Sequence, residues 1–304
     1  MFTRPEFQEF YKLYLSFLIK CAGLLEEDVQ AVAEQAHNSL CMIFDVKHGP
    51  SQRMIPFLGD IIDQFALYIK SVQIPQFFEM LFEFTRTYEK FIIENPEPFL
   101  NLIKLLVERG QEEYQTIKTG PQAEGNESIL KVIWNTIRNI VEKPIFVENF
   151  QDTVEAILTP LVAHLETDDN LPFEDDILEY MVSVMKLRKE VTPLFWIIFK
   201  LFGKIFNKQG GMIWHLFQPL NQIIIHGKKT LNEDPDAINS LIKMLIEGLN
   251  PTSPKANAIN VSEAATLLQL VIQYLVITNE QWEAIIQTTL EKVKNIQFDF
   301  LKAR

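Results

Sequence analysis

The chain has 304 residues and a formal net charge of −12, and 47% of its residues are apolar. This apolar content is sufficient for a large core and argues against an intrinsically disordered chain. The acidic balance argues against a nucleic-acid-binding surface, because such a surface needs basic residues that neutralise phosphates.

Helical patterns run along the whole chain. Glycine is scarce, at 11 residues, which favours helices over many short strands. In the first predicted helix, Phe7, Phe10, Tyr14 and Leu18 recur at steps of three and four and form one face. The same reasoning predicts roughly thirteen helices, separated by short breaks rich in proline, glycine or acidic residues. Their approximate ranges are 5–25, 26–46, 52–72, 75–94, 98–118, 127–142, 147–165, 173–189, 192–206, 212–226, 235–249, 261–276 and 279–302.

Two positions in this succession carry further predictions. Residues 119–127, TGPQAEGNE, form the most polar break in the chain and are predicted to be a loop. Pro160 lies inside the predicted helix 147–165, where its missing N–H predicts a kink.

The lengths of the helices and of the breaks predict the fold class. Helices joined by short breaks pair into antiparallel hairpins, and stacked hairpins form a solenoid. We therefore predict an all-α fold, an α-α superhelix of HEAT or ARM type, with residues 1–304 as a single α-solenoid of about six to seven helix pairs. A globular helix bundle is the alternative, but 304 residues exceed the usual size of a single-core domain.

The sequence has few patterns that indicate catalysis or metal binding. It contains no phosphate-binding loop, no dinucleotide fingerprint, no C-x-x-C and no pair of histidines at H-x-x-x-H spacing. Cys21 and Cys41 are interpreted as small buried residues in a reducing compartment. We therefore expect a protein that is not an enzyme and that has no cofactor or metal. No window of 18 uncharged apolar residues occurs, so no membrane insertion is expected.

One acidic stretch is a candidate binding surface. Six carboxylates fall within eleven residues with no lysine or arginine among them: Glu166, Asp168, Asp169, Glu174, Asp175 and Asp176. Such a patch can bind a partner rich in lysine and arginine. The alternative is that these residues complement the dipole at the start of a helix and keep the preceding loop solvated.

Aromatic residues are dense in the predicted helices 75–94 and 192–206. The second of these contains Phe195, Trp196, Phe199, Phe202 and Phe206. Core packing is the favoured interpretation, and a smaller share of the rings is expected to line crevices between helices that are open to a partner.

Residues 126–227 contain four consecutive apolar-periodic segments: ESILKVIWNTIRNIVE, FQDTVEAILTPLVAHLE, FEDDILEYMVSVMKLRKEVTPLFWIIFKLFGKIF and MIWHLFQPLNQIIIHG. This succession resembles the C-terminal half of importin-β (karyopherin-β) family nuclear transport receptors of the importin seven and eight type. Within these segments, Val191-Thr192-Pro193 and Trp196 begin a helix with proline in its first turn.

The resemblance implies a receptor that shuttles between nucleus and cytoplasm and imports proteins by binding basic cargo on an acidic concave surface. It also implies FG-repeat nucleoporins as partners. In this family the small GTPase Ran binds mainly to N-terminal repeats, and nothing in this sequence occupies that position. We therefore expect the cargo-binding C-terminal portion of such a receptor. The alternative hypothesis is a helical-repeat scaffold or adaptor outside transport.

Overall fold

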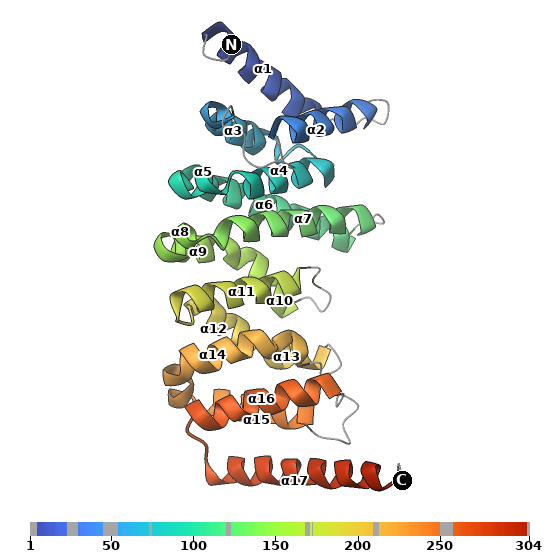
Figure 1. The fold of residues 1–304 in the computed structure, drawn as a ribbon, viewed down its shortest axis with the longest axis vertical. Helices are drawn as coiled ribbons and strands as arrows, with labels where there is room; N and C mark the ends of the chain where they lie inside the picture. Colours follow the sequence, from blue (N-terminus) through green and yellow to red (C-terminus); the bar gives the residue numbers. More distant parts are fainter. Residues whose placement is uncertain are drawn as a thin grey trace. The chain divides into compact units, whose positions relative to one another are not determined.

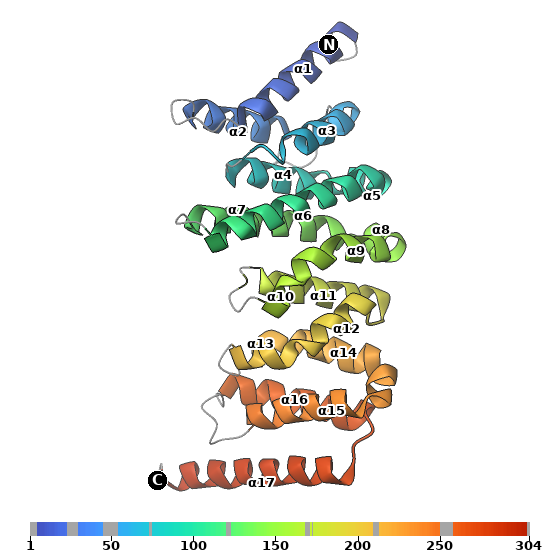
Figure 2. The same cartoon turned by 180° about the vertical axis from the view of Figure 1, so that it is seen from behind.

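The computed structural model describes residues 5–22, 30–44, 54–72, 75–119, 123–167, 171, 173–208, 213–249 and 258–302. These residues form seventeen α-helices and a short 3-10 helix, and they include no strand (Figures 1 and 2). The predicted all-α fold is therefore confirmed. By its internal contacts the chain divides into two compact units, Met1–His164 and Leu165–Arg304.

The first unit is a two-layer stack of helices. One layer consists of α1, α3, α6 and α9, each in contact with the next, and the other consists of α2, α4 and α7. Contacts of α1 with α2, and of α6 with α7, join the layers into helix pairs. The helices are α1 (Pro5–Ala22), α2 (Gln30–Phe44), the 3-10 helix η2 (Ile55–Phe57), α3 (Leu58–Tyr68), α4 (Pro75–Thr87), α5 (Glu89–Glu94), α6 (Pro96–Thr119), α7 (Ala123–Val141), α8 (Pro144–Asn149) and α9 (Gln151–Val162).

The second unit repeats this two-layer arrangement. Helices α11, α14 and α16 contact one another in succession, as do α13, α15 and α17, and α15 also contacts α14 and α16 across the layers. This order is that of a helical repeat, in which each repeat packs on its neighbours. The helices are α10 (His164–Thr167), α11 (Glu174–Arg188), α12 (Pro193–Lys200), α13 (Phe202–Lys208), α14 (Trp214–Glu233), α15 (Pro235–Leu249), α16 (Ala258–Tyr274) and α17 (Asn279–Lys302).

Aromatic residues fill the core of the first unit. Phe65 of α3 packs against Phe77 and Phe84 of α4, with ring centroids 5.6 and 5.5 Å apart, and all three rings are fully buried. Edge-on and tilted ring pairs of this kind stabilise a core beyond the area they bury. The core interpretation of the aromatic residues in 75–94 is confirmed at Phe77 and Phe84.

Several predicted helices are divided in the structure. The range 75–94 divides at Tyr88, 147–165 divides at Phe150 and Ala163, and 192–206 divides at Leu201. At Leu201 the backbone N–H donates to the carbonyl of Ile198, 2.9 Å away, a tightened turn that ends α12. Pro160 lies within α9, which ends shortly after it at Val162.

Other boundaries also differ from the predicted ones. Helix α6 extends to Thr119 and α7 begins at Ala123, so the loop predicted over 119–127 is shorter than expected, and residues 120–122 lie outside the described part of the chain. Helix α14 extends to Glu233 because Leu231, which is fully buried, continues its apolar face. Cys21 is buried as expected, whereas the side chain of Cys41 lies outside the described residues.

Candidate functional site

The acidic stretch predicted from the sequence lies in the second unit, around α10 and the start of α11. Glu166 is in α10 and is exposed. Glu174, Asp175 and Asp176 form the first turn of α11, where carboxylates complement the helix dipole. Asp168 and Asp169 lie outside the described residues. The structure therefore brings three of the six predicted residues together at one helix terminus.

Glu174 is not on the surface that a partner could reach. The residue is 6% exposed, and its carboxylate lies 2.7 Å from the Lys208 ammonium at the end of α13. A buried carboxylate needs such a partner to offset the water that it loses. Glu174 therefore links α11 to α13, so at this one residue the structural interpretation fits better than the binding interpretation.

Two further basic groups lie beside the acidic stretch. Lys204 donates a hydrogen bond to the backbone carbonyl of Glu166 at 2.7 Å, and Nδ1 of His215 lies 3.2 Å from a carboxylate oxygen of Asp175. The Asp175 side chain remains 65% exposed. The sequence gives no local signal for these contacts, because the basic residues lie on helices that follow much later in the chain.

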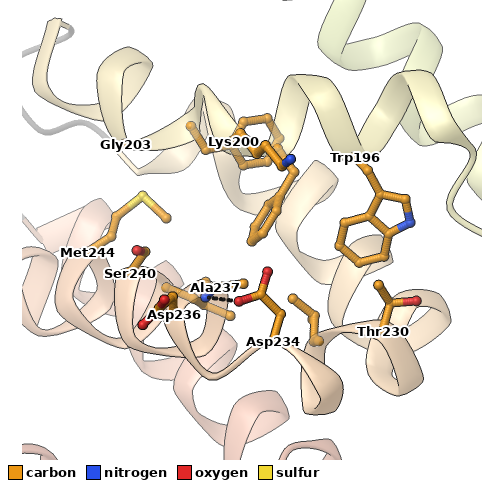
Figure 3. Close-up of a pocket in the computed structure, with 13 residues that line it drawn as sticks. Trp196, Lys200, Gly203, Thr230, Asp234, Asp236, Ala237, Ser240 and Met244 are labelled. Atoms are coloured by element: carbon orange, nitrogen blue, oxygen red, sulfur yellow. Dashed lines mark hydrogen bonds between the residues drawn. The ribbon is translucent and has the colours of Figure 1, made fainter.

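The structure also contains a cleft in the second unit, of about 480 Å³ (Figure 3). It lies between the α12–α13 segment on one side and the junction of α14 with α15 on the other. Its walls are mainly apolar, and two carboxylates and one ammonium group stand among them. The lining residues are Trp196, Phe199, Lys200, Phe202, Gly203, Thr230, Leu231, Asp234, Asp236, Ala237, Ser240, Leu241 and Met244.

Three aromatic side chains form one wall of this cleft. The rings of Trp196 and Phe199 are 5.7 Å apart at an interplanar angle of 85°, and those of Phe199 and Phe202 are 5.7 Å apart at 71°. Because neighbouring rings are nearly perpendicular, the wall presents both ring faces and ring edges. Phe202 is buried, whereas Trp196 and Phe199 are partly exposed.

Gly227 of α14 fixes the position of the Trp196 indole. A Cβ atom at position 227 would lie 2.8 Å from two carbons of the indole and 3.0 Å from a methyl carbon of Val191. Only glycine allows the ring to lie this close to the α14 backbone. The indole therefore packs with one edge on α14 while it lines the cleft.

The opposite side of the cleft carries charge. Asp234 precedes α15, and one of its carboxylate oxygens accepts a hydrogen bond from the Ala237 N–H at 3.0 Å. Figure 3 shows the other oxygen directed into the cleft, toward the aromatic wall. Asp234, Asp236 and Lys200 are all exposed residues that line the cleft. The cleft thus combines an aromatic wall with a carboxylate that faces it.

The sequence predicts only one half of this cleft. Core packing is the favoured interpretation of the aromatic residues in 192–206, and Phe195, Phe202 and Phe206 are buried. The smaller share of rings expected to line a crevice corresponds to Trp196 and Phe199, which line this cleft. The other half comes from residues 230–244, which have no signal of their own because capping aspartates and aliphatic residues are common in helix pairs. Only the packing of α13 against α15 brings the two halves together.

Comparisons with known proteins do not identify a family. No family model matches the chain, and neither a curated protein nor a solved structure shows significant similarity to it. Among the described residues, no helix is long and apolar enough to cross a membrane.

Proposed function

We propose that this chain is a nuclear transport receptor of the importin-β type, or the cargo-binding portion of one, and that it binds basic protein cargo. The observation that carries the proposal is the stacking of helix pairs in two layers within each unit, in a chain with a net charge of −12. Stacked helix pairs provide an extended surface, and an acidic chain attracts basic partners over long range. The resemblance of residues 126–227 to this receptor type is the reason for proposing nuclear transport and not another function of stacked helix pairs.

The mechanism follows from the repeat. Because each helix pair contacts only its neighbours, small changes at successive contacts add up, and the stack bends around a partner. Electrostatic attraction sets the rate of encounter, and it weakens when salt shortens the Debye length from about 10 Å at 0.1 M to about 3 Å at 1 M. FG-repeat nucleoporins are the second proposed class of partner. This part of the proposal rests on the resemblance alone.

Retention of basic proteins by the immobilised chain tests the proposal. Linker histone and ribosomal proteins serve as ligands, and an acidic protein of similar size is the control. We expect retention at about 0.05 M salt and loss of most of it at about 0.5 M. A chain that retains no basic protein in a salt-sensitive manner would contradict the proposal.

A helical-repeat scaffold outside transport is the second candidate function, because stacked helix pairs are common to both classes. Nuclear accumulation separates them. In permeabilised cells, the labelled chain is expected to enter nuclei and to carry a bound basic protein with it. Binding of basic proteins without nuclear entry would favour the scaffold.

A further inference from the structure

We propose that the cleft between α12–α13 and the α14–α15 junction binds the arginine side chain of a peptide. The occupant is a guanidinium group that lies against Trp196 and Phe199 and pairs with the carboxylate of Asp234. The proposal deepens the function proposed above, because arginine is a side chain that a basic partner supplies. It rests on that function only for the source of the peptide.

The arrangement of the walls favours a cation. The electron-rich faces of aromatic rings attract a cation that lies within about 6 Å of the ring centroid. Trp196 and Phe199 stand at 85° to each other, so a group in the corner between them meets two rings at once. Figure 3 shows the second carboxylate oxygen of Asp234 directed into the cleft that both rings line. The rings and the carboxylate therefore both attract a cation that enters this cleft.

The carboxylate also disfavours an apolar occupant. A phenylalanine or leucine side chain in the cleft would remove water from the Asp234 carboxylate without replacing the hydrogen bonds that are lost. Asp234 is an exposed residue, so an apolar occupant would remove only part of its water, but it would replace none of the lost hydrogen bonds. A guanidinium group avoids this loss, because its N–H groups donate to the carboxylate while its flat face stacks on a ring.

Arginine fits the cleft better than lysine for the same reason. The ammonium of lysine is compact and strongly hydrated, whereas the guanidinium is planar and more weakly hydrated. Stacking on Trp196 together with pairing to Asp234 needs a planar donor. We therefore expect an arginine peptide to bind more tightly than its lysine counterpart.

Lys200 also lines the cleft. Its ammonium lies on the rim, on the aromatic side, while Asp234 and Asp236 lie on the other side (Figure 3). The ammonium repels a bound guanidinium and so opposes the attraction of the two aspartates. Lys200→Gln is therefore expected to strengthen binding of the arginine peptide, whereas weaker binding in this variant would contradict the proposed position of the guanidinium.

Nuclear magnetic resonance of the tryptophan indole N–H groups tests the proposal on the full chain. The peptide Gly-Ser-Arg-Ser-Gly, blocked at both ends, is titrated against the labelled protein, and the Trp196 signal is identified by its loss in Trp196→Phe. We expect the Trp196 signal to move in a saturable manner. The signals of Trp214 and Trp282, which are also partly exposed, are internal controls and should not move.

Citrulline in place of arginine is the matched control for charge, because it keeps the shape of the side chain and removes the cation. We expect the citrulline peptide to bind about tenfold more weakly, which is the size of a cation–π contribution of about 1.4 kcal/mol. Equal binding of the two peptides, or stronger binding of the same peptide with phenylalanine at the central position, would overturn the proposal.

Asp234→Asn tests the carboxylate without removing the helix cap, because asparagine caps helices as well as aspartate does. We expect about tenfold weaker binding of the arginine peptide and no loss of folding. The control is Asp152→Asn at the first turn of α9, which should leave the binding unchanged. Unchanged binding in Asp234→Asn would refute the proposed pairing.

The two proposals can fail separately. If Asp234→Asn loses the peptide but the chain still retains basic proteins in a salt-sensitive manner, the cleft is one contact among several. If the unaltered chain binds the peptide but retains no basic protein, the receptor function is wrong and the arginine site stands.

Discussion

Arg109 and Glu113 form a buried ion pair one turn apart on α6. They are 6% and 5% exposed, and Arg109 also donates to the backbone carbonyl of Lys70 at 3.4 Å. Burial raises the pKa of Glu113 above its ordinary value of 4.5, although the nearby Arg109 guanidinium acts in the opposite direction. Burial disfavours the charged form of Glu113, and the attraction of Arg109 favours it. The effect of burial on the pKa is the larger of the two.

Replacing Arg109 by methionine is expected to destabilise the first unit strongly at neutral pH. The change leaves Glu113 buried without its cationic partner, which costs about 3–5 kcal/mol. A carboxyl whose pKa is raised on folding contributes stability below its unfolded pKa, and this contribution is lost as pH rises through the folded pKa. The loss of Arg109 raises that pKa further, so the variant's deficit should be small below pH 4.5 and should grow above it.

Urea unfolding of the Arg109→Met protein, followed from about pH 4 to about pH 7, measures this deficit. The control is Lys90→Met, which removes an exposed ion pair to Glu94 on α5 and should cost less than about 1 kcal/mol. A deficit of equal size at both ends of the pH range would contradict the role assigned to Glu113.

Asn260 is the second residue whose loss should be costly. It is fully buried in α16, and its side-chain oxygen accepts a hydrogen bond from the Ile213 N–H at 3.1 Å, just before α14 begins. Asn260→Ala leaves this N–H buried without its partner, and we expect a loss of about 1–3 kcal/mol in the free energy of unfolding. Thermal and urea unfolding measure the loss. Asn101→Ala at an exposed position of α6 is the control, for which about 0.5 kcal/mol or less is expected.

At the scale of single helices, the end of α11 carries backbone strain. Lys189, the residue that follows α11, has a φ of 59°, in the left-handed region. Its N–H donates to the Met185 carbonyl and caps the helix. Helices commonly end on a residue in this conformation, and glycine is preferred there because it has no Cβ.

Lys189→Gly is therefore expected to stabilise the second unit, by about 1 kcal/mol. Thermal unfolding measures the gain. The matched control is Lys186→Gly, three residues earlier in the last turn of α11, where the backbone is helical and glycine should cost up to about 1 kcal/mol. Two changes of the same residue type should thus have opposite signs, and a loss of stability at both positions would contradict the strain argument.

The helices themselves were predictable from the sequence because their signals are local. Apolar residues at steps of three and four mark the buried faces, and Pro193 and Pro235 mark helix starts at N1. The divisions at Tyr88, Phe150 and Leu201 were not predictable, since none of these positions carries proline or glycine. There the packing of each segment on its own neighbours outweighs the continuity of the periodic pattern.

The candidate sites show the same division between local and distant signals. Carboxylates at the start of α11 are visible in the sequence, but the burial of Glu174 depends on Lys208, which lies 34 residues away. The aromatic wall of the cleft is visible in the segment 192–206, whereas its partner Asp234 has the local signature of a helix cap. A pattern along the chain reports which face is apolar, and only tertiary packing determines which charge lies opposite it.

At the scale of the whole molecule, the division into two compact units has a consequence for stability. Each unit contains its own buried apolar residues, such as Phe65 and Phe84 in the first and Ile223 and Leu245 in the second. In stacked repeats stability is a sum of terms from each repeat and its neighbours, so local damage need not spread along the chain.

We expect Asn260→Ala to destabilise only the second unit. Hydrogen exchange followed by mass spectrometry measures each helix separately, and faster exchange should appear in α14 and α16, by about tenfold for each 1.4 kcal/mol lost. Exchange in α4, α6 and α7 of the first unit should not change. Arg109→Met should have the opposite pattern. Exchange should become faster in α6 and α7 and should stay unchanged in α14 and α16. Equal acceleration in both units by either variant would mean that the chain unfolds as one cooperative body, because a local loss would then lower the stability of every helix alike.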